Sequence, residues 1–274
     1  MTLCPACGGP TTGRRLRLDR SVLARCARCG HAVTVAAPAS VRAEAYGGSL
    51  DARRRYERVY LPAREAAWTA ALAELAPADG QRLLDVGANY GHFLSLALGE
   101  GWDAYGFEPG DGLRAHAVPG SDGRLFATLE AAAARGPFAV VTLWDVLEHI
   151  DEPGDLLARL ADLLTGDGLV AVRVPDTRVL AALEASPPRR LLAPAYLKLC
   201  HPINPEEHPH HFTPESLERI AGAAGLRAID SLRSGSAERV VAAATVLDLL
   251  PRHALAHWGA RLPYEFTMFL SRAV

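Results

Sequence analysis

The chain has 274 residues, of which 49% are hydrophobic and 22% are charged, and its formal net charge at pH 7 is −2. This composition is that of a globular protein with a full hydrophobic core, and it excludes a mainly disordered chain. The near-neutral charge argues against a general nucleic-acid or membrane-surface binder. No apolar run reaches the ~18 residues of a membrane span, and the first residues lack the apolar core of a signal peptide. We therefore expect a cytoplasmic protein whose cysteines are reduced unless a metal holds them.

Two C-x2-C motifs lie close together near the N-terminus. Their members are Cys4, Cys7, Cys26 and Cys29. Each motif lets two thiolates reach one ion from a tight turn, and four thiolates complete the tetrahedral coordination of Zn²⁺. The spacing predicts a structural zinc ribbon over residues 1–37, with a disulfide pair or a redox motif as the alternative. Such a closed site has no position for a substrate, so we expect catalysis elsewhere and expect the adjacent His31 to be exposed.

Residues 38–78 carry apolar side chains near helical spacing, with interruptions at Gly47–Gly48 and at Pro62. This pattern predicts a helical linker between the ribbon and the main domain. The linker also offers side chains that could cover the mouth of a pocket, although plain packing is the alternative for each. These side chains are Tyr46, Tyr56 and Tyr60.

From residue 79 to residue 274 the pattern alternates between strands and helices. The predicted strands are 82–88, 103–109, 124–126, 138–146 and 169–175, and the predicted helices are 90–101, 128–135 and 152–168. This alternation is typical of an α/β fold with a doubly wound, mostly parallel, Rossmann-like sheet. In such sheets a ligand binds beyond the carboxyl ends of the strands, at the point where the strand order reverses.

The first predicted strand runs into an acid and a glycine-rich turn. Asp85 is followed by Gly87 and Gly91, which let the backbone turn sharply and let a ligand approach it. Glu108 ends the next strand, where a carboxylate can accept both hydroxyl groups of a ribose. A carboxylate side chain is a favourable neighbour for a cation and an unfavourable one for a negatively charged pyrophosphate. The pattern therefore favours a positively charged nucleoside without phosphate, and S-adenosylmethionine fits this description better than NAD does.

The stretches "LLDVGANYG", "GFEP" and "FAVVTLWDVLEHIDEP" resemble motifs of the class I S-adenosylmethionine-dependent methyltransferases, over roughly residues 80–235. The resemblance implies methyl transfer and a set of residues that contact the cofactor. This set is Asp85, Gly87, Asn89, Gly91, Glu108 and Asp145. Asn89 replaces the middle glycine of the usual motif, and this form is similar to that of the zinc-containing methyltransferases of nucleotide-linked deoxysugars. That family also begins with a cysteine-rich zinc domain, but it usually carries a further C-terminal domain that this chain is too short to hold. The resemblance thus implies a small-molecule acceptor, natural-product or sugar-like.

An acidic and histidine-containing stretch follows the fourth predicted strand. Asp145, Glu148 and His149 are spaced so that one helical turn would bring them together. In one interpretation Glu148 and His149 cap and orient the loop, and in another His149 is a general base. The third is a divalent-metal site, since the acid-x-x-Glu-His pattern is similar to that of the related quinone O-methyltransferases.

A second cluster of histidines precedes a predicted helix that Thr213 caps. Its members are His201, His208, His210 and His211. The sugar C-methyltransferases place an acid-His-Phe sequence here. The residues at the matching positions are His210, His211 and Phe212, so His210 replaces the acid. The resemblance implies that His211 is the general base and that His210 positions the substrate. A surface loop and a zinc or iron site formed by the histidines are the alternatives.

Two other classes of function stay open from the sequence. A non-catalytic protein could bind a partner through the ribbon and only sense the cofactor with its Rossmann-like domain. An NAD-dependent oxidoreductase would need a regular G-x-G-x-x-G motif, which the chain lacks. The sequence also leaves open whether the chain forms a homodimer.

Overall fold

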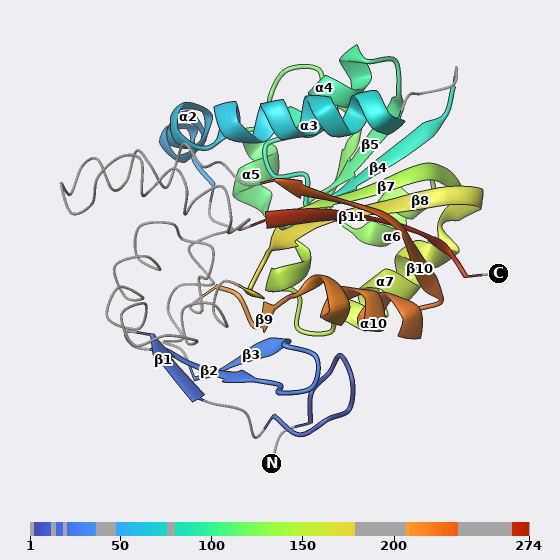
Figure 1. The fold of residues 1–274 in the computed structure, drawn as a ribbon. Coiled ribbons are helices and arrows are strands. Elements are labelled where there is room, and N and C mark those ends of the chain that lie inside the picture. Colours follow the sequence, from blue (N-terminus) through green and yellow to red (C-terminus); the bar gives the residue numbers. More distant parts are fainter. Residues whose placement is uncertain are drawn as a thin grey trace, which may run out of the picture.

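The computed structural model describes residues 3–11, 15–18, 21–36, 48–75, 80–178, 207–234 and 265–273. The predicted candidates Tyr46 and His201 lie outside these ranges. Two sheets organise the described part of the chain, one of seven strands and one of four (Figure 1). No helix in these ranges is long and apolar enough to cross a lipid bilayer.

The seven-stranded sheet has the order β10-β11-β8-β7-β4-β5-β6. Its parallel strands are β4 (Arg82–Val86), β5 (Asp103–Phe107), β6 (Leu125–Phe126), β7 (Phe138–Trp144) and β8 (Leu164–Pro175). Strand β11 (Glu265–Arg272) runs antiparallel between β8 and β10 (Leu226–Ser234). The chain passes from β4 to β6 on one side and then returns to β7 on the other. The predicted Rossmann-like sheet is therefore confirmed, and its order reverses between β4 and β7.

Helices cover both faces of this sheet, because its central strands bury side chains on both sides. On β4, Leu83 packs into one apolar cluster with Phe93, and Leu84 packs into the other with Leu157. Figure 1 shows α3 and α4 on one face and α7 and α10 on the other. The helices and the short 3-10 helix that follow the strands are α4 (His92–Gly99), α5 (Asp111–Ala115), α6 (Leu129–Ala133), η1 (Leu147–His149), α7 (Pro153–Asp162) and α10 (Pro214–Ala223).

The predicted helix over residues 152–168 is wrong in its second part. Helix α7 ends at Asp162, and strand β8 already begins at Leu164. The start of β8 is irregular, because the pairing of β7 with β8 shifts register after Phe138. At Gly168, a side-chain Cβ would lie only 2.9 Å from the carbonyl oxygen of Phe138. Glycine therefore allows close approach within the sheet here and does not mark the end of a helix.

The predicted helical linker contains two helices, α2 (Leu50–Val59) and α3 (Leu61–Leu75). Ser49 begins α2 by accepting the Ala52 N–H with its hydroxyl oxygen at 3.1 Å. Pro62 does not interrupt the helix, because it lies in the first turn of α3, where its missing N–H is not needed. The break between the two helices lies at Tyr60, the C-cap of α2. Trp68 of α3 packs edge-on against Phe93, with ring centroids 5.6 Å apart.

The four-stranded sheet has the order β1-β2-β3-β9 and is antiparallel throughout. Its N-terminal strands are β1 (Arg15–Leu18), β2 (Ser21–Arg25) and β3 (Ala32–Ala36). The fourth strand, β9 (His210–His211), comes from the predicted methyltransferase domain, with Val33 opposite His210. One sheet thus contains strands from two distant parts of the sequence, which the predicted division into residues 1–37 and 79–274 did not anticipate (Figure 1).

Candidate active site and cysteine centre

The glycine turn after β4 is held in left-handed backbone conformations. The φ angles of Gly87, Asn89 and Gly91 are 73°, 53° and 80°. A Cβ on Gly87 would lie 2.5 Å from a methyl group of Val146, so only glycine fits. Asn89 tolerates its angle because its side-chain oxygen accepts the next backbone N–H at 2.8 Å. The turn therefore presents bare backbone at the carboxyl end of β4.

Glu108, at the end of β5, lies directly against this turn. Its Oε2 accepts the Asn89 N–H at 2.9 Å, and its Oε1 accepts the Gly110 N–H at 2.7 Å. Burial raises the pKa of this carboxyl group, and the two backbone donors oppose that rise. The two features that the sequence assigned to one nucleoside, the glycine turn and Glu108, are thus adjacent in space.

Asp85 is buried one residue before the end of β4. Its Oδ1 accepts the Thr142 hydroxyl at 2.8 Å. Burial raises the pKa of Asp85 to about 8, the charge of Glu108 adds to the rise, and the Thr142 hydrogen bond opposes it. A cation close to this group would favour its ionised form and lower its pKa again.

Asp145 follows β7 and has a left-handed φ of 59°. Arg173 of β8 contacts both its oxygens, with Nε 3.0 Å from Oδ1 and Nη2 2.5 Å from Oδ2. Arg64 of α3 reaches Oδ2 at 3.0 Å. Burial would raise the pKa of Asp145, but the two guanidinium groups lower it to about 2. Neither arginine is among the residues predicted for the site, although an arginine inside the apolar run of β8 is a visible signal in the sequence.

Glu148, His149 and His208 come together beside the end of β7. One ligand atom from each lies within 4.8 Å of the others. The rings of His149 and His208 are nearly perpendicular, with centroids 4.6 Å apart. Burial raises the pKa of Glu148 well above its usual value and lowers that of His208 to about 3. Asp145, which the sequence grouped with Glu148 and His149, is instead held by the two arginines.

Two atoms of this group are buried without a hydrogen-bond partner in the described part of the chain. They are Oε2 of Glu148 and Nδ1 of His208. Buried polar atoms without partners are rare because each costs about 1–3 kcal/mol. A carboxylate oxygen and two imidazole nitrogens form a donor set that suits a divalent cation.

The other two predicted histidines face the N-terminal sheet. Nε2 of His210 lies 2.9 Å from the carbonyl oxygen of Asp151, and its Nδ1 lies 3.2 Å from Nε2 of His31. Nε2 of His211 lies 2.9 Å from the hydroxyl oxygen of Thr34. Burial lowers the pKa of His211 well below its usual value. The structure therefore places His208, and neither of these two residues, beside Glu148 and His149.

The expectation that His31 is exposed is wrong, since its side chain is 1% exposed. Its ring packs edge-on against Phe212 at a centroid distance of 5.2 Å. Its Nδ1 lies 3.2 Å from the hydroxyl oxygen of Ser216 in α10. His31 therefore lies in the contact between the N-terminal sheet and the Rossmann-like domain. The local sequence around it does not predict this role.

The four cysteines form a compact group of free thiols. The Sγ atoms of Cys4 and Cys29 are 3.5 Å apart, as are those of Cys7 and Cys26. Zinc–sulfur bonds of ~2.3 Å in a tetrahedron imply sulfur–sulfur distances of about 3.8 Å, so the donors fit this metal. Burial raises the pKa of the Cys4 and Cys29 thiols, so a nearby cation is needed to hold them as thiolates.

Both C-x2-C turns close through a glycine. The Gly8 N–H donates to the Cys4 carbonyl at 2.8 Å, and the Gly30 N–H donates to the Cys26 carbonyl at 3.0 Å. The two glycines have φ angles of 64° and 75°. The two turns therefore have matching geometry and present their thiols to one point.

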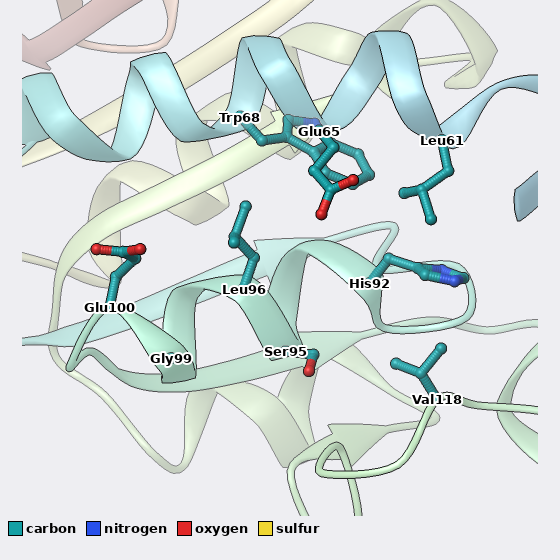
Figure 2. A pocket seen from close by; sticks show the side chains of 9 residues that line it. All are labelled: Leu61, Glu65, Trp68, His92, Ser95, Leu96, Gly99, Glu100 and Val118. Carbon is teal, nitrogen blue, oxygen red and sulfur yellow. The ribbon is translucent and has the colours of Figure 1, made fainter.

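A separate pocket of about 390 Å³ lies between α3 and α4 (Figure 2). It is lined by Leu61, Glu65, Trp68, His92, Ser95, Leu96, Gly99, Glu100 and Val118. Figure 2 shows that its walls are side chains of the two helices and of the loop at Val118. The pocket is therefore distinct from the group of acids and histidines at the carboxyl ends of the strands.

Comparison with known proteins defines the class of protein to which this site belongs. A family model described as a methyltransferase domain matches residues 60–231. The ubiquinone biosynthesis O-methyltransferase of Shewanella halifaxensis is 28% identical over 165 residues, which is 56% of this chain and 66% of that protein. The match thus spans slightly less than two thirds of the relative's length.

Solved structures show the same fold. A mycolic acid cyclopropane synthase bound to S-adenosylhomocysteine has a TM-score of 0.54 at 17% identity, covering 77% of this chain and 85% of its own. An S-adenosylmethionine-dependent methyltransferase from Archaeoglobus fulgidus has a TM-score of 0.51 at 15% identity, covering 79% and 99%. The chain belongs to the methyltransferase domain family. Its Rossmann-like domain has the fold of solved S-adenosylmethionine-dependent methyltransferases.

Proposed function

We propose that this protein transfers a methyl group from S-adenosylmethionine to a carbon or oxygen atom of a small-molecule acceptor, natural-product or sugar-like. The observation that carries the proposal is the glycine turn with its three left-handed residues, together with the Glu108 carboxylate that accepts the Asn89 N–H. In this proposal Glu108 binds the ribose, the turn passes under the cofactor, and Asp85 faces its positive charge, whereas Asp145 lines the site already paired with Arg173 and Arg64.

We propose His149 as the general base. S-adenosylmethionine supplies an activated methyl group, so the protein mainly has to align the acceptor and remove its proton. The side chain of His149 is partly exposed, and burial lowers its pKa, so it is neutral and able to accept a proton near pH 7. His211 is the base implied by the sequence resemblance, but its Nε2 is hydrogen-bonded to the Thr34 hydroxyl. In this proposal His210 and His211 hold the segment while Glu148 orients His149.

Calorimetry with S-adenosylhomocysteine, followed by transfer of labelled methyl groups from S-adenosylmethionine, tests this function. We propose two acceptor probes, catechol for planar diols and a nucleotide-linked keto-deoxysugar for sugars. His149→Ala should lower turnover on the accepted probe at least about a hundredfold and remove the acidic limb from the pH profile of the residual activity, while the affinity for S-adenosylhomocysteine changes less than about twofold. His211→Ala should lower turnover but keep the shape of that profile. If the protein binds no S-adenosylhomocysteine, the proposal fails.

A second candidate is a metal-assisted O-methyltransferase. The support is the buried Oε2 of Glu148 and Nδ1 of His208, which lack partners among the described residues and lie near His149. A divalent cation there would supply Lewis-acid polarisation of an acceptor hydroxyl, and His149 would then be a ligand and not a base. Turnover should stop with a mild chelator and return with Mg²⁺ or Mn²⁺. His208→Ala should lose that metal while the metal of the four cysteines remains.

We also propose that the four cysteines hold one structural Zn²⁺. The support is the sulfur–sulfur distances of 3.5 Å and the two matching turns. Elemental analysis should find one zinc per chain. A non-catalytic role for the whole protein would be favoured if S-adenosylhomocysteine binds but no methyl transfer occurs on any probe.

A further inference from the structure

Strand β3 of the N-terminal sheet is hydrogen-bonded to the histidine segment, which we define as residues 207–213. Ala32 pairs with His211 and Val33 pairs with His210. The Thr34 N–H donates to the carbonyl oxygen of Pro209 at 2.9 Å. The backbone of the histidine segment therefore forms one edge of the sheet that the cysteines anchor.

The side chain of Thr34 makes two further contacts with this segment. Its hydroxyl donates to the carbonyl oxygen of His208 at 2.7 Å, and the same oxygen lies 2.9 Å from Nε2 of His211. A hydroxyl group has one proton, which is used on the carbonyl, so towards His211 the oxygen can only accept. The neutral ring of His211 therefore carries its proton on Nε2, and Thr34 selects this tautomer.

His208, whose carbonyl Thr34 holds, directs its ring towards the group at the end of β7. The ring centroid of His208 is 4.6 Å from that of His149 and 6.2 Å from that of His211. A shift of the His208 backbone would move Nδ1 of its ring relative to Glu148 and His149. Since reacting groups must be held to within a fraction of an ångström, such a shift would lower the rate of the proposed methyl transfer.

We infer that Thr34 is a positioning residue. Through its hydrogen bonds, the position of the cysteine-anchored sheet determines the position of the His208 backbone and the tautomer of His211. The inference gives the ribbon a role in the proposed methyl transfer beyond stability, and in that respect it rests on the proposed function. Thr34 contacts no predicted cofactor residue in the described part of the chain. Its effect should therefore be seen on the histidines and on turnover, and not on cofactor affinity.

Histidine NMR of the full-length, zinc-loaded protein tests this inference without a known acceptor. In the wild type, long-range ¹H–¹⁵N spectra should show His211 as a single neutral tautomer with its proton on Nε2. Thr34→Val removes the hydroxyl and keeps the side-chain shape, so His211 should become a mixture of tautomers and the ring signals of His149 and His208 should move. Thr34→Ser should restore the wild-type pattern, because the hydroxyl returns.

Thr69→Val is the matched control, since the Thr69 hydroxyl donates only to a backbone carbonyl within α3. It should leave all histidine signals unchanged. Zinc content and the dissociation constant for S-adenosylhomocysteine should stay within about twofold in all variants, and turnover of Thr34→Val should fall about tenfold on an accepted probe. Unmoved His149 and His208 signals in Thr34→Val would overturn the inference. Absence of cofactor binding in the wild type would instead overturn the proposed function and leave the NMR result valid.

Discussion

The glycine turn and the histidine segment both lie at the candidate site, but they are built in opposite ways. The turn is local, because the Asn89 N–H and the Glu108 carboxylate that accepts it are 19 residues apart. The histidine segment depends on distant partners, since Thr34 is 174 residues from His208 and 177 from His211. The cofactor side should therefore tolerate damage to the ribbon, whereas the acceptor side should not.

Removal of the ribbon metal should give the largest effect and separate the two regions. Cys26→Ser deletes one of four thiolates, and structural zinc sites contribute ~10 kcal/mol or more to the folding of the units that they hold. Zinc content should fall from one per chain to near zero. Hydrogen exchange should then show loss of protection in residues 32–36 and 207–213.

The control for this prediction is the cofactor side of the same variant. Exchange in residues 82–91 and the affinity for S-adenosylhomocysteine should remain close to those of the wild type, because β4 and β5 support the turn. An equal loss of protection in both regions would show that the ribbon and the Rossmann-like domain fold as one unit. That result would contradict the independence of the two regions.

This contrast also explains how far the sequence predicts the structure. Periodicity and glycine placement predict the sheet, the turn and the position of Glu108, because these features are determined by residues that lie close together in the sequence. They do not predict that His31 lies buried beside His210, since these residues are 179 apart. The resemblance to a family motif implies that His211 is the general base. The long-range pairing of β3 with β9 instead places the Thr34 hydroxyl against its ring.

The arginines beside Asp145 give a second example. Arg173 lies in a strand that reads as a buried apolar run, so its charge had to be paired, but the sequence did not identify its partner. The partner becomes visible only when β7 and β8 are aligned in parallel, with Trp144 opposite Arg173. The sequence pattern thus predicts that Arg173 is charged and buried, whereas identifying Asp145 as its partner requires the register of the sheet.

Gly87→Ala should give the next largest effect and damage the local region alone. The new Cβ would meet Val146 at 2.5 Å, and the φ of 73° disfavours any residue but glycine. Strain and overlap together should cost about 2–5 kcal/mol, seen as a lower denaturation midpoint and a much weaker affinity for S-adenosylhomocysteine. Gly99→Ala is the matched control, because nothing lies within 4 Å of its Cβ position at the end of α4. Wild-type affinity in Gly87→Ala would show that the turn is not the cofactor site.

Glu108→Gln tests the ribose contact with a smaller change. The carboxylate accepts two backbone N–H groups, and an amide would turn its NH₂ towards one of them. Loss of this acceptor should weaken S-adenosylhomocysteine binding about tenfold, measured by calorimetry. Glu130→Gln, the same change on the exposed surface of α6, should have no effect. Equal affinities for the two variants would remove Glu108 from the cofactor site.

The smallest predicted effect is a pH dependence of cofactor affinity that Asp85 controls. Its pKa is raised to about 8 by burial, so the group is mainly protonated at pH 7, and a cationic ligand favours the ionised form. If only the ionised form binds, affinity for S-adenosylmethionine should rise about fivefold from pH 7 to pH 8, and binding at pH 7 should release almost one proton.

Asp85→Asn supplies the reference for that measurement. The ligand's own amino group titrates in the same range, but its contribution is the same in both proteins. The carboxamide oxygen can still accept the Thr142 hydroxyl, so the fold around β4 should persist. Calorimetry in two buffers of different ionisation enthalpy should show proton release in the wild type in excess of that in the variant. Identical release would mean that Asp85 does not change its ionisation when the cofactor binds, and the predicted pH dependence would then be wrong.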